Sequence, residues 1–432
     1  MSQPRLRLAR RDQMTFRCES LDQLLPPEHM VRTVWAFTLQ LDLTPLYATI
    51  KAVEGHVGNT PIDPRILFAL WLYATLDGVG SARELERLTT SHLAYQWLCG
   101  DVSVNYHTLA DFRVAHPDWL DGQLTDTVAV LLQQGLVTLQ HVAQDGMKVR
   151  ADAGADTFRR QPTLERCRRE AEDQVEKLSR QTGESDTAVS RRQQAARERA
   201  TREKAERLQA ALDHLPAVHA SREAFKKGTG DQARVSTTDP EARTMKMPDG
   251  GFRPAYNVQF ATDVASGLVV DAMVVNRGTD NGLMGPCVER IGQRYGRAPQ
   301  AMLVDAGFGS LADIDRLATT HGTTTYMPVK FEKKLKAQGK DPSAPRSGDT
   351  PAVRDWRARM GTAAAQTIYK NRSSSAEWVN AGCRNRGWYR VSVRGVAHVT
   401  CCALWQALAH NLVTTHRRLK SRANLAGPLG GS

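Results

Sequence analysis

Three acidic residues stand where their carboxylates could share a metal site. Asp145 lies in LQHVAQDGMKVRADAG, whose alternation predicts a strand that carries the acid among apolar side chains. Asp305 follows the apolar run AMLV, typical of a strand buried on both faces, and Glu377 lies on a predicted later helix. Two neighbouring strands and a helix packed across them can bring these carboxylates together. Such oxygen ligands suit Mg²⁺, and two ions can activate the attacking oxygen and stabilise the leaving one in phosphodiester chemistry.

Each acid also has a purely structural explanation. Asp145 and the glycine after it form a common hairpin-turn pair. Asp305 could cap the loop that leaves its strand, and Glu377 could complete a capping box with Ser374. Capping does not account for the surroundings of Glu377, which is the only acid after Asp355 in a tail with twelve Lys and Arg. A metal ligand within a phosphate-binding surface does.

Composition narrows the class of protein. The 432 residues are 41% hydrophobic, enough for sizeable cores, and 58 Lys and Arg against 46 Asp and Glu give a net charge of +12. This excess favours a polyanionic partner such as nucleic acid. The longest apolar run, residues 66–76, is shorter than the roughly 20 residues that span a bilayer, and no secretory signal precedes it. Seven scattered cysteines without a CxxC pair argue against disulfides or zinc. We expect a cytoplasmic protein with no membrane partner.

Residues 20–137 read as helical throughout. Asp63 and Pro64 form a helix start, and residues 81–98 and 105–116 resemble two helices joined by a turn. This order suits a helix-turn-helix whose base-reading residues lie between Asn105 and Arg113. The alternative is a helical bundle in which Arg83, His107 and Arg113 are ordinary surface groups.

Beyond the first strand, residues 159–228 carry 17 basic and 12 acidic residues in helical runs. They predict a coiled-coil-like hairpin, either a solvated charged surface or a nucleic-acid-binding arm. A strand hairpin at 254–278, a helix at 282–295, a helix at 311–322 and a strand at 323–329 follow. Residues 331–362 read as a loop or insertion, and the final helices are expected at 374–384 and 399–419.

Several blocks together resemble the DDE transposases of bacterial insertion sequences. The blocks are SARELERLTTSHLAYQWLCG with HTLADFR, QDGMKVRADAG, DPEARTMKMPDGGFRPAYNVQFATD, VDAGFG, and AEWVNAGCRNRGWYRVSVRGVAHV with ALAHNL. The resemblance implies an RNase H-like α/β (α+β) fold, a mixed sheet with flanking helices, behind an all-α N-terminal domain. It also implies that Asp145, Asp305 and Glu377 form a catalytic triad that binds two Mg²⁺ ions, with Mn²⁺ as a substitute.

The last acid also lies in a partial match to the family's Tyr, Arg, Glu, Lys signature, formed here by Tyr369, Arg372, Glu377 and Arg384. One extra residue separates Arg372 from Glu377, and arginine replaces the usual lysine at Arg384. These departures put the DNA contacts in question more than the acid. The residues expected to contact DNA are Arg83, His107, Thr108, Arg113, Lys148, Tyr369, Arg372 and Arg384.

The expected organisation is a helical DNA-binding domain at 1–137, a catalytic domain at 138–158 and 229–420, and a basic helical insertion at 159–228. The expected activity is cleavage of the ends of an insertion sequence and their joining to target DNA. Double-stranded DNA, both terminal inverted repeats and target, would be the partner of a homodimer associated with the nucleoid. The alternatives are a catalytically inactive DNA-binding regulator and an RNase H-like nuclease that cuts without joining.

Overall fold

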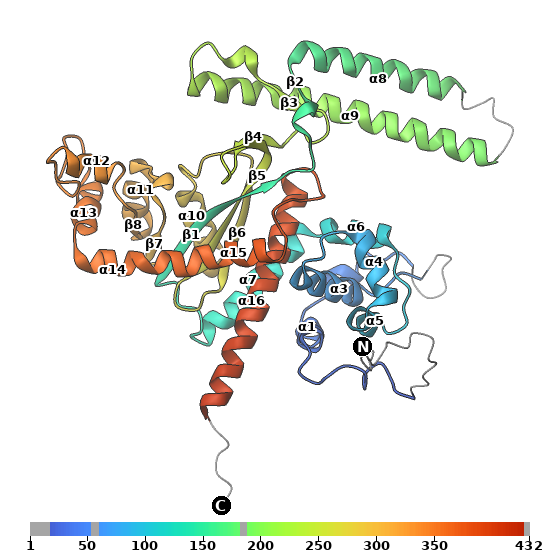
Figure 1. Ribbon diagram of the computed structural model, residues 1–432, viewed down its shortest axis with the longest axis horizontal. Coiled ribbons are helices and arrows are strands. Elements are labelled where there is room, and N and C mark those ends of the chain that lie inside the picture. The colour runs from blue at the N-terminus through green and yellow to red at the C-terminus, as the bar shows by residue number, and fades with distance from the viewer. Residues whose placement is uncertain (1–17, 53–59, 182–187, 427–432) are drawn as a thin grey trace, which may run out of the picture.

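A computed structural model describes residues 18–52, 60–181 and 188–426 of the chain. Figure 1 shows a group of N-terminal helices in blue, a central sheet with helices on its faces, and a long helical hairpin that projects away from the sheet. Within the described ranges, no helix is long and apolar enough to cross a membrane.

The N-terminal part is helical. Its helices are α1 (Met30–Leu39), α2 (Thr44–Tyr47), α3 (Pro64–Asp77), α4 (Ala82–Ser91), α5 (Leu93–Cys99), α6 (Tyr106–Ala115) and α7 (Pro117–Gln133). The predicted start of α3 is confirmed. Asp63 is the N-cap, its carboxylate accepts a hydrogen bond from the Arg65 amide, and Pro64 is the first residue of the helix. Gly78, with φ of +79°, ends the helix in the left-handed conformation.

The segment 81–98, read as one helix, is two helices. His92 has extended backbone angles, with φ −127° and ψ 124°, and separates α4 from α5. Tyr95 in α5 is fully buried, its ring centroid lies 5.0 Å from that of Tyr73, and its hydroxyl donates to Asp77 at 2.9 Å. The break therefore lets α5 turn its aromatic face onto α3. Asn105 caps α6, as its position predicts, by accepting from the Thr108 amide.

The central sheet has six strands in the order β4-β5-β1-β7-β8, with β6 also paired to β5. The strands are β1 (His141–Arg150), β4 (Arg243–Lys246), β5 (Phe252–Asp263), β6 (Val269–Val275), β7 (Ala301–Leu303) and β8 (Thr324–Tyr326). β1 is antiparallel to β5 but parallel to β7, and β7 is parallel to β8. This mixed topology confirms the RNase H-like fold class.

The predicted β5–β6 hairpin is confirmed by the antiparallel pairing of its strands. Asp263 holds its turn by accepting from both the amide and the hydroxyl of Ser266, and Gly267 adopts φ of +69°, which glycine tolerates. The same carboxylate accepts from the Leu139 amide at the approach to β1. This buried acid therefore fixes β5 against the start of β1.

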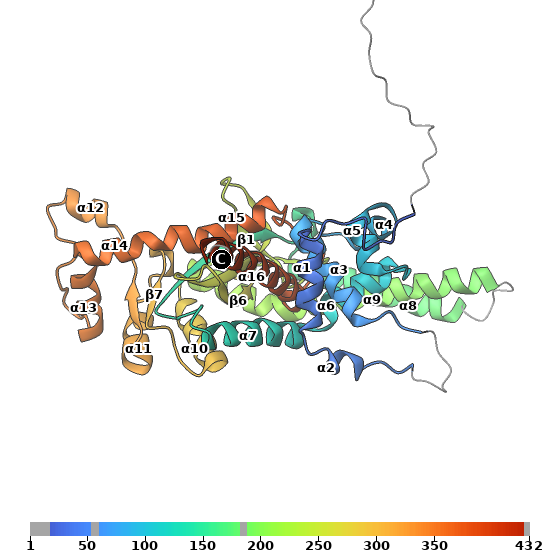
Figure 2. The same cartoon turned by 90° about the horizontal axis from the view of Figure 1, so that it is seen from below.

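Helices cover both faces of the sheet, as Figure 2 shows from below. The helices that follow β6 are α10 (Met284–Tyr295), α11 (Leu311–His321), α12 (Glu332–Ala337), α13 (Pro351–Met360), α14 (Ala363–Arg372), α15 (Trp378–Asn385) and α16 (Val396–Ala426), and α12 and α13 lie at the outer end, beyond α11. Two predictions are wrong here. Residues 331–362 contain α12 and α13 rather than only a loop, and the helix expected from Ser374 already begins at Ala363, where Thr362 caps it.

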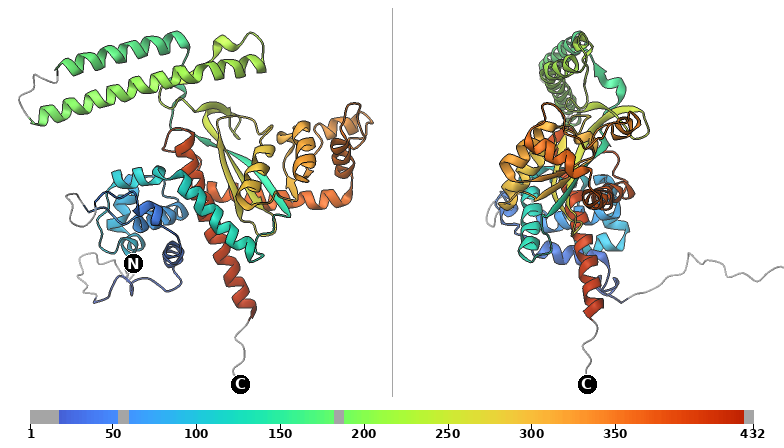
Figure 3. Two further views of the ribbon diagram at one scale, coloured as in Figure 1. Left: turned by 180° about the vertical axis from the view of Figure 1, so that it is seen from behind. Right: turned by 90° about the vertical axis from the view of Figure 1, so that its left-hand side faces the viewer.

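α16 joins the N-terminal helices to the sheet, and Figure 3 shows it between them from behind. The Trp405 ring lies 5.0 Å from that of Phe68 on α3, and its Nε1 donates to the Arg113 carbonyl oxygen. On its other side, Asn411 bonds both the amide and the carbonyl of Val269 in β6. One hydrophobic core therefore runs from the N-terminal helices into the sheet.

The projecting hairpin comprises α8 (Gln161–Gln181) and α9 (Ala188–Phe225), closed at its base by the paired strands β2 (Phe158–Arg159) and β3 (Val235–Ser236). Leu164, Leu208 and Leu215 form a separate small core with Val235. Charges along the helices pair within one helix, as between Arg168 and Glu172 or Arg202 and Glu198. Two helices lie where the sequence predicts a helical hairpin, and local ion pairs offset much of their charge.

Candidate active site

Asp145 lies in the middle of the longest pairing of the sheet, opposite Phe260 of β5. The hairpin-turn explanation of this acid is therefore wrong, because its neighbours on both sides continue the strand. Ala143, two residues earlier on the same face, is buried against Leu303 and Ala376. The face that carries Asp145 is thus the face covered by the helix with Glu377.

Asp305 is brought beside Asp145 by strand register. β1 and β7 are parallel with Ala143 paired to Leu303, so both acids lie two residues beyond a paired position on adjacent strands. Neighbouring strands are about 4.8 Å apart, and the alternation of side chains directs both to one face. Asp305 also caps its loop, because its Oδ1 accepts from the Gly307 amide at 2.7 Å. The structural and chemical explanations of this acid are compatible.

Glu377 ends a π-helical turn, Ser373–Glu377, inserted between α14 and α15. The hydroxyls of Ser373, Ser374 and Ser375 donate to the carbonyl oxygens of Lys370 and Asn371, which the wider turn leaves less well paired. Because the helix is continuous here and the Glu377 side chain makes no cap bond, the capping-box explanation is wrong. Glu377 is 55% exposed.

Arg372 forms ion pairs with two of the three acids, Glu377 and Asp145. Its Nη2 lies 3.0 Å from Glu377 Oε1 and its Nη1 lies 3.7 Å from Asp145 Oδ1. Burial lowers the pKa of the Arg372 guanidinium, but Tyr369 and the charges of all three acids outweigh it and leave the pKa raised. The guanidinium also lies over the Tyr369 ring, 6.0 Å from its centroid. Tyr369, Arg372 and Glu377 of the predicted signature are therefore brought together.

Asp145 is the most constrained of the acids. Burial and then the nearby Asp305 charge raise the pKa of its carboxyl, against the lowering effects of Arg372 and Asn380. Asn380, which the sequence did not single out, donates from Nδ2 to Asp145 Oδ2 at 2.9 Å. Its spacing of three from Glu377 on a helix is the only sequence signal that could have drawn attention to it.

The donor set suits a divalent cation, but its present spacing does not. Among the described residues, no three His, Cys, Asp or Glu side chains lie close enough to hold one ion. Arg372 supplies the positive charge at this point, contacting Asp145 and Glu377 with a guanidinium whose Nη1 has no hydrogen-bond partner. Carboxylate oxygens are the ligands that Mg²⁺ and Mn²⁺ prefer in proteins. The chemistry of the donors therefore fits such an ion at the place that the Arg372 guanidinium occupies here.

The other residues expected to contact DNA have differing environments. Arg83 is exposed above the Tyr106 ring, and His107 is exposed beside it, while Thr108 bonds Asn105 through its amide and hydroxyl. Arg384 is exposed about two helical turns beyond Glu377. Lys148 is an odd number of residues from Asp145 in β1, so the two side chains lie on opposite faces of the sheet. Any contact of Lys148 with DNA would therefore be made on the face of the sheet opposite to the acids.

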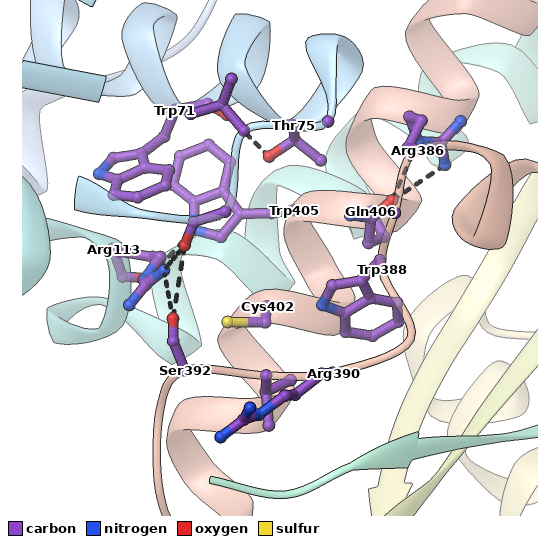
Figure 4. Close-up of a pocket in the computed structure, with 15 residues that line it drawn as sticks. Trp71, Thr75, Arg113, Arg386, Trp388, Arg390, Ser392, Cys402, Trp405 and Gln406 are labelled. Carbon is purple, nitrogen blue, oxygen red and sulfur yellow. Dashed lines mark hydrogen bonds between the residues drawn. The ribbon is translucent and has the colours of Figure 1, made fainter. Parts of the chain in front are cut away.

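Arg113 is buried instead of presented to solvent. Its Nη1 donates to the Gly80 carbonyl oxygen at 2.6 Å and to Ser392 Oγ at 3.4 Å, and its guanidinium lies over the Trp71 ring. Figure 4 shows this side chain in a pocket at the junction between the N-terminal helices and the segment before α16. None of the three acids lines that pocket. The position of Arg113 favours a structural role over contact with DNA.

Two family models match the chain, a transposase domain (DUF772) over residues 19–115 and a transposase DDE domain over residues 229–412. The second covers Asp305 and Glu377, and the strand with Asp145 precedes it. The chain belongs to the DDE transposases of insertion sequences. The comparisons with curated proteins and with solved structures gave no match.

Membership of this family makes the chain a DNA-binding enzyme of transposition and DNA recombination. DDE transposases typically use divalent metal ions, in agreement with the oxygen donors gathered around Arg372. The helical transposase domain ends at Ala115, within the helices that α16 ties to the sheet. The two matched regions are thus physically connected through one core.

Proposed function

We propose that this transposase cleaves the ends of its insertion sequence and joins them to target DNA, with Asp145, Asp305 and Glu377 as the ligands of two Mg²⁺ ions, for which Mn²⁺ can substitute. The observation that supports the proposal is that Asp145 and Glu377 both pair with Arg372, while the register of β1 against β7 places Asp305 beside Asp145. Mutual repulsion of these carboxylates is costly unless a cation lies among them.

When bound, the ions would activate water or a 3′ hydroxyl and polarise the scissile phosphate. The protein would supply the fixed frame. Asp145 is held in a central strand, Asp305 by its bond to the Gly307 amide, and Glu377 by the π-helical turn. Arg372, released from the acids, would be free to donate two hydrogen bonds to a DNA phosphate. No covalent enzyme intermediate is required.

The DNA would extend from this site over exposed basic residues. Arg384 on α15 is the nearest exposed arginine along the helix of Glu377, and Arg83 with His107 would contact the terminal inverted repeats from α4 and α6. We propose that 1–137, 138–158 with 229–420, and 159–228 act as the DNA-binding, catalytic and accessory parts, and that the active form on DNA is a homodimer. Phosphate contacts of this kind make binding steeply dependent on salt.

The test is a cleavage and joining assay with the full-length protein, Mg²⁺ and DNA that carries the sequences flanking its own gene. Wild type should release ends and join them to a target duplex. Asp145→Asn, Asp305→Asn and Glu377→Gln should each lower both steps by orders of magnitude while melting temperature and DNA binding persist. Asp315→Asn, on the neighbouring helix α11, is the matched control and should retain activity.

Each alternative corresponds to a distinct result. Cleavage without joining would identify a nuclease, and specific DNA binding without either reaction would identify a regulator. Near-normal joining by a well-folded Glu377→Gln protein would remove this residue from the set of ligands.

A further inference from the structure

Asn380 occupies a position that packing alone does not explain. It lies on α15, one helical turn after Glu377, and its side chain is buried, with 2% of the residue exposed. Nδ2 donates to Asp145 Oδ2 at 2.9 Å, whereas the buried Oδ1 has no hydrogen-bond partner. A buried acceptor without a partner lowers stability. Leucine, of similar size, would fill the same space without that cost.

The orientation of the amide follows from the charge of its neighbour. An ionised carboxylate only accepts hydrogen bonds, so the NH₂ group of Asn380 must face Asp145 and the oxygen must face away. The contact occupies Asp145 Oδ2 and leaves Oδ1 as the oxygen that faces Arg372, 3.7 Å away. Asn380 therefore determines which oxygen of Asp145 is directed into the group of acids.

The contact also ties two acids to one another. Glu377 and Asn380 are three residues apart on one continuous helix, and Asn380 bonds an acid that is far away in sequence, on the central strand β1. Movement of the helix along the sheet would therefore disturb both Glu377 and the rotamer of Asp145. Ala376, buried against Ala143 and Leu303, holds the helix at this level of the sheet.

We propose that Asn380 is a positioning residue that presents Asp145 Oδ1 to the catalytic metal. The inference rests on the proposed function, because it assigns to Asp145 the role of metal ligand. Groups that orient metal ligands through hydrogen bonds typically change metal affinity by about 10- to 100-fold when they are replaced. A residue that served only packing would change stability and leave metal affinity as it was.

The experiment measures Mn²⁺ binding to full-length protein by electron paramagnetic resonance, together with the Mg²⁺ concentration that gives half-maximal cleavage. Asn380→Leu should raise the dissociation constant for Mn²⁺ and the half-maximal Mg²⁺ concentration about 10-fold or more. DNA affinity without metal and the melting temperature should stay close to wild type. Asn380→Ala, which shortens the side chain instead of replacing it with one of similar size, should show the same effect on metal binding. It takes the place of the leucine variant if that variant folds poorly.

Asn411→Ala is the matched control. Asn411 is equally buried, with 2% exposed, and bonds only the backbone of Val269. This variant should lose stability and keep wild-type metal dependence. If both Asn380 variants kept wild-type metal dependence while Asp145→Asn was inactive and bound Mn²⁺ weakly, the inference about Asn380 would be overturned and the proposed function would stand. Normal metal binding and cleavage by Asp145→Asn would instead overturn the proposed function, and the role of Asn380 with it.

Discussion

Arg372 and Glu377 are five residues apart in one helix, yet Arg372 Nη2 lies 3.0 Å from Glu377 Oε1. In a regular α-helix, with about 3.6 residues per turn, residues three or four apart share a face and residues five apart do not. The π-helical turn between them takes up the additional residue. The extra residue that distinguished this chain from the family signature is therefore absorbed locally, and the side chains still meet.

The first prediction is that deletion of Ser374 will be tolerated. Ser374 is exposed, and its removal converts the π turn into α-helix while α14 and α15 keep their mutual register. Arg372 and Glu377 would then be four apart and still on one face. Joining activity should stay of the same order as wild type. Insertion of alanine after Ser374 should rotate Glu377 by about 100° and abolish activity. An inactive, well-folded deletion variant would contradict this account.

The second prediction concerns Arg372→Gln, which removes the cation beside Asp145 and Glu377. Without metal the variant should melt at a lower temperature, because the mostly buried carboxylate of Asp145 loses the positive charge beside it. Added Mn²⁺ should raise its melting temperature more than that of wild type, because the ion no longer has to displace a guanidinium. Thermal melts in EDTA and in Mn²⁺ measure both effects. Equal metal-induced shifts in the two proteins would show that Arg372 does not compete with the ion.

The acids could be found from sequence because each lies in a segment with a clear period or apolar run. Side chains alternate between the two faces along a strand, so the sequence spacing of three between Asp145 and Lys148 already predicts that they lie on opposite faces of the sheet. The meeting of Asp145 with Asp305 depends on the register of β1 against β7, which no local pattern encodes. The family resemblance supplied that long-range information.

Other features had no local signal. The break at His92 contains neither glycine nor proline, and it forms because Tyr95 packs against α3. The π turn occurs in a run of serines without apolar periodicity. Arg113 bonds Ser392 across 279 residues, so a side chain that reads as exposed helix surface becomes part of a junction. Tertiary contacts decided each of these three cases.

The third prediction separates Arg83 from Arg113. Arg83→Ala, at an exposed position, should weaken DNA binding and reduce the slope of affinity against salt by about one phosphate contact, with little change in stability. Arg113→Met should leave the salt slope unchanged and lower stability by about 2–4 kcal/mol, through loss of its bonds to Gly80 and Ser392. Mobility shifts at several salt concentrations and urea unfolding measure the two quantities. A reduced salt slope with unchanged stability in Arg113→Met would show that Arg113 contacts DNA.

The fourth prediction defines the boundary of the helical hairpin. Thr157 and Thr237 meet at its base, where the Thr237 amide donates to the Thr157 carbonyl oxygen at 3.1 Å. Replacement of residues 158–236 by a short Gly/Ser bridge should leave a soluble protein with one cooperative melt. Removal of only 159–228 should behave worse, because it exposes Val235 and Ala233 from the small core of the hairpin. Loss of cooperative melting in the longer deletion would place the hairpin within the catalytic core.

The fifth prediction follows from His410 on α16. Its ring is buried against Trp378, and its Nε2 lies 2.9 Å from the Gly267 carbonyl oxygen in the β5–β6 turn. Burial lowers the pKa of His410 to about 4 from an ordinary value of 6.5. As the pH falls, His410 is therefore protonated near pH 6.5 in the unfolded chain but only near pH 4 in the folded chain. The stability from this group is complete above pH 6.5 and is lost progressively between those two values.

At about 1.4 kcal/mol per pH unit, the loss from His410 alone amounts to roughly 3 kcal/mol across the window. His410→Gln keeps an N–H donor for Gly267 and does not titrate, so its free energy of unfolding should fall less steeply than that of wild type between pH 7 and 4.5. Urea unfolding of both proteins at several pH values, in EDTA so that metal binding does not contribute, measures the difference. Parallel curves for the two proteins would mean that His410 titrates alike in the folded and unfolded chains, and that its burial against Trp378 does not exclude the proton.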